Sequence, residues 1–271
     1  MKISVIQMNS QTSKADNIAQ AKKLVAEAVE HDHPTMVVLP EVWTMLGGSL
    51  EQRRAAAEEI PGGEAYRALQ EMARTYKIYV HGGSMLERAG KEYFNTTVAF
   101  DPHGNEIARY RKIHLFDVTT PDGKEYKESA TVGRGDAVVT YKAGSVTVGC
   151  SICYDLRFGE LYRTLAQKGA EVIMLPAAFT LQTGKDHWEP LIRARAIETE
   201  TYFCAAAQVG SYPQGNELRQ SWGHSMIVDP WGHMMAQSSD GPGHASARID
   251  MDYLRDIRQK LPVHQHRVLK D

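Results

Sequence analysis

A cysteine at the end of a largely apolar run is the residue of this chain best suited to covalent chemistry. Cys153 follows residues 146–152, which have the pattern of a buried strand, and polar side chains come directly after it. The thiolate is the reactive form of cysteine, and a free cysteine titrates near about 8.5. The fold must therefore place a base or a positive charge beside Cys153 if it is to act as a nucleophile.

Two charged residues stand at comparable positions. Glu41 follows residues 36–40, a second predicted buried strand, and the carboxyl ends of strands are where open α/β sheets place their sites. Burial there would raise the pKa of the carboxyl group and make it a usable base. Lys112 follows a predicted hairpin and could supply the positive charge. Position alone also allows both side chains to be solvated.

The spacing of Cys150 and Cys153 matches a C-x-x-C redox motif or half of a zinc site. In an extended run, residues three apart are separated by about 10 Å and face opposite sides, which exceeds the limit of about 7 Å for a disulfide. No second C-x-x-C and no H-E-x-x-H is present. We therefore expect no metal site and no redox pair, and we predict that Cys204, in an apolar run, belongs to the core.

Short apolar runs alternate with amphipathic segments, which is typical of an α/β fold. The predicted strands are residues 3–8, 36–40, 78–85, 146–152, 172–177 and 202–209, the predicted helices are 16–30, 64–76, 160–168 and 188–200, and two hairpins turn at 101–104 and 229–232. Leu-Pro and Asp-Pro-x-Gly sequences recur in both halves, either through pseudo-symmetric duplication or as common turn chemistry. No linker interrupts the pattern, so we expect one domain, residues 1–271.

Composition favours a small molecule as the partner. The 271 residues are 42% hydrophobic and 24% charged, with a formal net charge of −2, which gives no electrostatic basis for binding nucleic acid or an anionic membrane. No apolar window approaches the length of a membrane span or a secretory signal. Three cysteines, an odd number, argue against a disulfide framework. We expect a cytoplasmic protein.

Three segments together resemble the signature segments of the nitrilase, or carbon-nitrogen hydrolase, superfamily. They are Leu-Pro-Glu ending at Glu41, Tyr-Arg-Lys-Ile-His-Leu around Lys112, and Cys-Ser-Ile-Cys-Tyr-Asp-Leu-Arg-Phe around Cys153, in the expected order. The resemblance extends over nearly the whole chain. It implies a pseudo-symmetric four-layer α-β-β-α sandwich that pairs into an eight-layer dimer.

The resemblance also implies roles. Glu41 would be the general base, Lys112 would stabilise the tetrahedral oxyanion, Cys153 would be the nucleophile and Glu128 would be a further glutamate that positions the substrate. The reaction would be amide hydrolysis through a thioester with ammonia release, and it would need no metal or organic cofactor.

Within the superfamily, residues 154–158, 187–198 and 261–267 resemble the amidases of α-keto acid amides, the branch of deaminated glutathione amidase and ω-amidase. Arg157 could bind a substrate carboxylate with its fork of donors, although a structural ion pair is an alternative. Tyr154, Phe179 and Thr183 are the other expected substrate-binding residues, and the loop 119–128 is expected to carry specificity.

Deaminated glutathione is the expected substrate, and 2-oxoglutaramate or an N-carbamoyl amide are the alternatives. A catalytically silent binding scaffold is the non-enzyme alternative. Residues 253–271 combine basic and apolar side chains and end in an irregular segment. We hypothesise that this segment packs across the interface of a homodimer.

Overall fold

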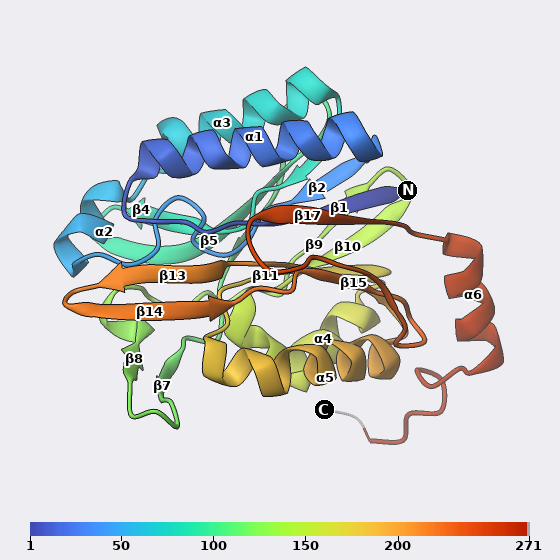
Figure 1. Ribbon diagram of the computed structural model, residues 1–271. Helices are drawn as coiled ribbons and strands as arrows, with labels where there is room; N and C mark the ends of the chain where they lie inside the picture. Colours follow the sequence, from blue (N-terminus) through green and yellow to red (C-terminus); the bar gives the residue numbers. More distant parts are fainter. Residues whose placement is uncertain (270–271) are drawn as a thin grey trace.

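Two β-sheets form the centre of the computed structural model, which describes residues 1–269 (Figure 1). The first sheet has the strand order β17-β1-β2-β3-β5-β4, and β6 pairs with β5. Its strands are β1 (Lys2–Gln7), β2 (Met36–Val38), β3 (Tyr79–His81), β4 (Met85–Ala89), β5 (Glu92–Phe100), β6 (Glu106–Arg111) and β17 (Gly243–Arg248). Because β1, β2 and β3 run parallel, the chain leaves β2 at the same edge as its neighbours.

The second sheet has the order β16-β15-β12-β11-β10-β9. Its strands are β9 (Thr140–Ala143), β10 (Val146–Cys150), β11 (Val172–Ala177), β12 (Tyr202–Ala207), β15 (Met226–Val228) and β16 (Met234–Gln237). Strands β10, β11 and β12 are parallel and almost entirely buried. Fully covered parallel strands read as continuous apolar runs, which is why the sequence shows these three so clearly.

Helices cover the outer faces of the two sheets. Figure 1 shows α1 (Lys14–Asp32) and α3 (Gly63–Tyr76) over the first sheet, and α4 (Gly159–Gln167) and α5 (Leu181–Thr199) over the second. One apolar cluster joins α1 and α3 to the first sheet, and a larger one fills the space between the sheets and reaches α4 and α5. Two helices lie at the ends of the molecule, α2 (Leu50–Ala56) and α6 (Met251–Lys260).

Two separate hairpins lie at the end of the molecule that also carries α2 (Figure 1). The first pairs β7 (Asp117–Thr119) with β8 (Glu125–Lys127), and the second pairs β13 (Val209–Gln214) with β14 (Glu217–Trp222). The sequence did not predict either hairpin, because neither has a continuous buried face. Both line the cavity described below.

The predicted turns at 101–104 and 229–232 are confirmed as the connections of β5 to β6 and of β15 to β16. Each begins with an aspartate whose side chain caps the turn: Asp101 accepts hydrogen bonds from the backbone of His103 and Asn105, and Asp229 does so from Trp231 and His233. The same local chemistry therefore closes one hairpin in each sheet.

One predicted strand is wrong as written. Residues 78–85 do not form one strand, because β3 ends at His81 and β4 begins at Met85. Gly83 has φ of 61°, and a Cβ there would lie 2.2 Å from the carbonyl oxygen of Pro40. This break brings the backbone of Ser84 against Pro40, next to Glu41. The predicted helix 188–200 also begins earlier, at Leu181, where Thr180 caps it.

Through residue 269, no helix has both the length and the apolar character needed to cross a membrane.

Candidate active site

Cys153 lies just beyond the end of β10, at a strained turn. The chain remains extended through Ile152, and then Cys153 takes φ of 47° and begins a short 3₁₀ helix, Cys153–Arg157. A left-handed conformation is unusual for a residue with a Cβ and persists only where the surroundings enforce it. Cys150 instead points into the core, and all three cysteines are free, with Cys204 fully buried as predicted.

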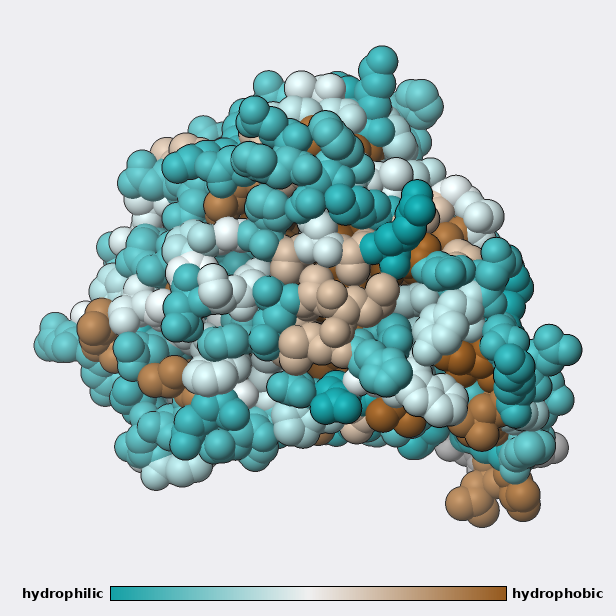
Figure 2. Space-filling view, turned by 45° about the vertical axis from the view of Figure 1, so that its right-hand side comes forward, coloured by the Kyte–Doolittle hydropathy of each residue, from teal (hydrophilic) through white to brown (hydrophobic). Residues whose placement is uncertain are grey.

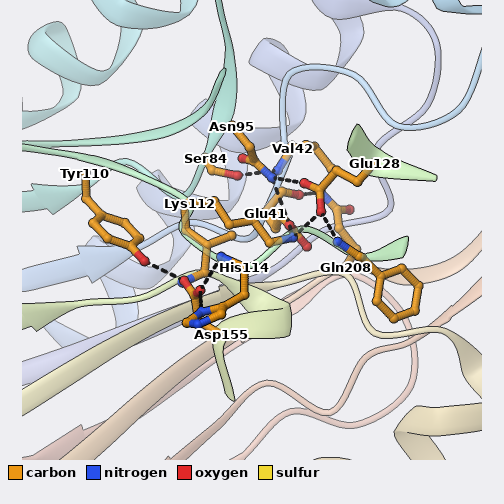
Figure 3. Close-up of polar contacts among 12 residues, drawn as sticks. Glu41, Val42, Ser84, Asn95, Tyr110, Lys112, His114, Glu128, Asp155 and Gln208 are labelled. Carbon is orange, nitrogen blue, oxygen red and sulfur yellow. Dashed lines mark hydrogen bonds and ion pairs between the residues drawn. The ribbon is translucent and has the colours of Figure 1, made fainter. Parts of the chain in front are cut away.

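A buried aspartate holds this turn. Asp155 accepts hydrogen bonds from the Ile152 backbone at 2.9 Å and from the Tyr110 hydroxyl at 2.6 Å. Its other oxygen accepts from the backbone of His114 at 3.1 Å and contacts the His114 ring at 2.7 Å (Figure 3). Because Tyr110 and His114 flank Lys112 in the chain, Asp155 ties the cysteine turn to the lysine segment. The sequence analysis did not single out Asp155, although it stands two residues after Cys153.

Lys112 lies between two glutamates. Its ammonium group is 2.8 Å from Glu41 Oε1 and 2.8 Å from Glu128 Oε2, and only 2% of the side chain is exposed (Figure 3). The side-chain amide of Asn95, in β5, donates to both glutamates at 3.0 Å, and the backbone carbonyl of Asn95 accepts the Lys112 backbone N–H at 2.9 Å. Sequence reasoning missed Asn95, which looks like an ordinary inward-facing position of a strand.

The backbone around Glu41 is fixed from both sheets. The Val42 N–H donates to the Ser84 hydroxyl at 3.0 Å, and the amide of Gln208 donates to the Glu41 carbonyl at 2.9 Å. Gln208 directly follows β12 of the second sheet, whereas Glu41 follows β2 of the first. The carboxylate is thereby held at the junction of the two sheets, 5% exposed, and the solvated alternative for Glu41 is not what the structure shows.

The charged groups of this buried site shift the pKa values of Lys112 and Cys153. Burial alone would lower the pKa of Lys112, but the carboxylates of Glu128 and Glu41 outweigh it and hold that pKa well above its usual value. Burial, followed by the charge of Glu41, raises the pKa of the Cys153 thiol well above normal, while Lys112 and the backbone N–H of Ala178 act in the opposite direction. The resting site therefore pairs a charged lysine with a neutral thiol that is hydrogen-bonded to Glu41.

A cavity of about 300 Å³ is lined by the four expected catalytic residues, Glu41, Lys112, Glu128 and Cys153, and by the four expected substrate-binding residues, Tyr154, Arg157, Phe179 and Thr183. The structure thus brings all eight residues expected from the sequence to one cavity. The loop 119–128 reaches it as well, through β8 and the residues that follow. Further lining residues that could not be predicted from the sequence are Arg53, Phe116, Tyr212, Gln214 and Arg219.

Arg157 has no carboxylate partner on the protein. No carboxylate oxygen lies within 4.0 Å of its guanidinium in the part of the chain that the structure describes, and its one polar side-chain contact is with His187 at 3.3 Å. The guanidinium lies 5.9 Å from the ring centre of Tyr154 and 5.6 Å from that of Phe179. The ion-pair alternative is therefore not formed, and the donors of Arg157 remain available to a ligand.

No group of three or more histidine, cysteine, aspartate or glutamate side chains within residues 1–269 is arranged to hold a metal ion.

Comparison with known proteins identifies the family of this chain. The family described as carbon-nitrogen hydrolase matches residues 2–259. A deaminated glutathione amidase of Synechocystis sp. is 42% identical over 269 residues, which cover 97% of this chain and 96% of that protein. The omega-amidase NIT2 of Danio rerio is 36% identical over 268 residues, covering 98% and 94%.

Solved structures show the same fold. The NitFhit protein of C. elegans superposes with a TM-score of 0.90 at 36% identity and covers 98% of this chain, which in turn spans only 64% of NitFhit. Nit3 of Saccharomyces cerevisiae, a member of the nitrilase superfamily, superposes with a TM-score of 0.87 at 28% identity, covering 99% and 97%. The chain belongs to the carbon-nitrogen hydrolase family of the nitrilase superfamily.

Proposed function

We propose that this protein is a cysteine-dependent amidase that hydrolyses the C–N bond of a small, carboxylate-bearing amide, with deaminated glutathione as its preferred substrate. The observation that carries the proposal is the convergence of Glu41, Lys112, Glu128 and Cys153 on one cavity that also holds the unpaired Arg157. Relatives named deaminated glutathione amidase and omega-amidase, at 36–42% identity, support the reaction class.

Catalysis begins from a neutral thiol. As the Cys153 sulfur attacks the amide carbon, Glu41 accepts the thiol proton, so the thiolate forms only while the bond is made. The negative charge on the carbonyl oxygen is stabilised by the ammonium of Lys112, which is already charged and fixed before the reaction. Glu128 holds Lys112 in place. It also balances the charge of Lys112 once Glu41 has accepted the thiol proton and become neutral.

Glu41 then returns its proton to the leaving amine, and the tetrahedral intermediate collapses to a thioester on Cys153. Water activated by Glu41 hydrolyses the thioester and releases the acid. The leaving amine is ammonia when the substrate is 2-oxoglutaramate. It is the dipeptide Cys-Gly when the substrate is deaminated glutathione, in which the scissile amide joins the 2-oxo acid to cysteine, so ammonia release is expected only from primary amides.

Arg157 is assigned to the carboxylate of the 2-oxo acid. It belongs to the same short helix as Cys153, and it lies over the rings of Tyr154 and Phe179, which line the cavity together with Thr183. A 2-oxo acid carboxylate is shared by deaminated glutathione and 2-oxoglutaramate, so both are accepted chemically. An N-carbamoyl amide remains the third candidate, and the intact set of charged residues disfavours a silent scaffold.

In this proposal the chain is a single domain, residues 1–271, whose two sheets and covering helices make a pseudo-symmetric four-layer α-β-β-α sandwich that pairs into an eight-layer homodimer. Exposed apolar side chains support pairing: Ile197, Trp231, Met234, Met235, Leu261 and Val263 are 36–52% exposed. Figure 2 shows apolar groups in the centre and lower right of a largely hydrophilic face. The hypothesised interface segment 253–271 begins within helix α6, Met251–Lys260, and its residues 270 and 271 lie outside the described part. Three free cysteines suit the cytoplasm.

The test is a parallel assay of deaminated glutathione, 2-oxoglutaramate and an N-carbamoyl amide, with separate detection of Cys-Gly and ammonia. Cys153→Ala should abolish all turnover, and Cys150→Ala, at a core cysteine outside the cavity, is the matched control that should retain it. Turnover of deaminated glutathione with release of Cys-Gly supports the proposal. Folded protein that turns over none of the three overturns it.

A further inference from the structure

The cavity has a second cationic wall, formed by Arg53 of α2 and Arg219 of β14. Arg219 is satisfied by the protein: it pairs with Glu217 at 3.3 Å, donates to the Glu125 carbonyl at 3.1 Å and lies 4.3 Å from the ring centre of Tyr126. Arg53 is not. Its Nε is buried without a hydrogen-bond partner, and no carboxylate oxygen within residues 1–269 lies within 4.0 Å of its guanidinium.

This lack of a partner is costly for an arginine, which keeps its charge in proteins. Burial lowers the pKa of Arg53, and the neighbouring charge of Arg219 lowers it further. Two like charges are thus held together in a partly buried wall that contains too little negative charge to balance them. An anion supplied by a ligand would relieve both the desolvation and the repulsion.

The position of Arg53 is fixed by the hairpin beside it. The Gly48 N–H donates to the Pro213 carbonyl at 3.1 Å, and the amide of Gln214 donates to the Gly48 carbonyl at 3.0 Å, so the start of α2 is tied to β13. A Cβ at Gly47 would lie 2.1 Å from the Pro213 carbonyl oxygen, which shows how closely the two segments meet. Ser49 and Gln52 then cap α2 reciprocally.

Tyr212 connects this wall to the reacting groups. Tyr212 is 7% exposed and lines the cavity, and its pKa is raised mainly by burial, with the charge of Arg219 lowering it and that of Glu41 raising it. Tyr212 in turn acts on Arg53, whose pKa it raises against the larger lowering effects of burial and Arg219. Arg157 comes from the turn after β10 in the second sheet, whereas α2 packs against β4 of the first. The two unpaired arginines therefore reach the cavity from different sheets.

We propose that Arg53, with Arg219 beside it, forms a second anion subsite that binds a carboxylate on the amine side of the scissile bond, so that the cavity selects amides with a carboxylate at both ends. This inference rests on the proposed function. Deaminated glutathione has the two carboxylates required, one on the 2-oxo acid and one on glycine. 2-Oxoglutaramate has only the first, so the Arg53 subsite separates the two substrates.

The test compares Arg53→Gln with Arg54→Gln, a matched control at an exposed neighbour outside the cavity. In Arg53→Gln, kcat/KM for deaminated glutathione should fall about 10- to 100-fold, mainly through KM, and far more than for 2-oxoglutaramate. Arg53→Lys should recover part of the loss. The wild type should show a similar loss when the glycine carboxylate of the substrate is converted to an amide, and Arg53→Gln should be indifferent to that change.

Binding provides an independent measurement. Calorimetric titration of deaminated glutathione into Cys153→Ala should show tight binding that weakens when Arg53→Gln is added. If the wild type hydrolyses deaminated glutathione but Arg53→Gln leaves the ratio of the two substrates unchanged, the subsite is wrong and the proposed function stands. If no candidate amide is turned over, the proposed function fails, and equal binding of deaminated glutathione and its glycine amide to Cys153→Ala then overturns the subsite separately.

Discussion

Replacing Lys112 by methionine should damage stability and catalysis through two separable effects. The side chain is 2% exposed and forms ion pairs of 2.8 Å with Glu41 and Glu128, whose side chains are 6% and 18% exposed. Removing one partner of a buried ion pair typically costs about 3–5 kcal/mol, because the remaining charge is left uncompensated. Lys112→Met should therefore lower the free energy of unfolding by about that amount, a large share of the stability of an ordinary domain.

The catalytic effect has a different origin. Loss of one preorganised group that stabilises an oxyanion costs about 2.7–4 kcal/mol, or about 10²- to 10³-fold in kcat. The double variant Lys112→Met with Glu128→Gln separates the two effects, because it removes one of the two uncompensated negative charges. Stability should recover in part, while kcat should stay low.

Urea unfolding followed by circular dichroism gives the stability of each variant, and kcat is measured on deaminated glutathione at temperatures where each variant is folded. If folded Lys112→Met keeps kcat within about tenfold of the wild type, Lys112 does not stabilise the oxyanion. If its stability is unchanged, the two glutamates do not depend on the lysine for charge balance, and the reasoning about the buried cluster is wrong.

Three further predictions concern residues around the site. Burial raises the pKa of Cys153 well above its usual value, so the rate of its alkylation by iodoacetamide should still increase above pH 9. The rate is measured by mass spectrometry of the Cys153 peptide, and a plateau near neutral pH would indicate a preformed thiolate and contradict the mechanism. Burial lowers the pKa of His81 from 6.5 to about 3, so the unfolded state takes up a proton first as pH falls, and stability should drop by about 2 kcal/mol between pH 6.5 and 5. In His81→Gln this part of the pH dependence should vanish, and an equal slope in both proteins would refute it. Asp155→Asn should lower kcat about 10- to 100-fold with little change in KM, because the turn that aims the nucleophile loses a charged acceptor; a change confined to KM would show that Asp155 does not act as a positioning residue.

The parts of the site that could be predicted from the sequence are those attached to buried strands. Glu41 and Cys153 each follow a continuous apolar run, so their places at strand ends could be inferred locally. Lys112 follows a hairpin whose turn is marked by Asp101 and Gly104. What the residues alone could not predict is the distance between them, since that depends on how the two sheets pack.

The rim of the cavity could not be predicted, for a physical reason. No side chain of helix α2 is fully buried, so Arg53 has no periodic apolar pattern around it. Strand β14 is largely exposed, and Arg219 looks like a solvated charge in an irregular segment. Both reach the cavity only because the segment before α2 binds β13, a contact between residues 165 or more positions apart in the chain.

The catalytic residues are held in the core, whereas the residues proposed to determine specificity lie on the rim of the cavity. Glu41 and Asp155 are held by hydrogen bonds that link the two sheets, and Lys112 is bound to Glu41, so a change at any of them disturbs the core as well as the reaction. Arg53 lies on a helix with no fully buried side chain, and it packs in neither apolar cluster of the core. Substitution at the rim can therefore alter which amine is accepted at little cost in stability. For this reason substrate preference should be measured on this chain itself, with Arg53 and Arg157 varied separately, because each arginine is expected to report on a different end of the substrate.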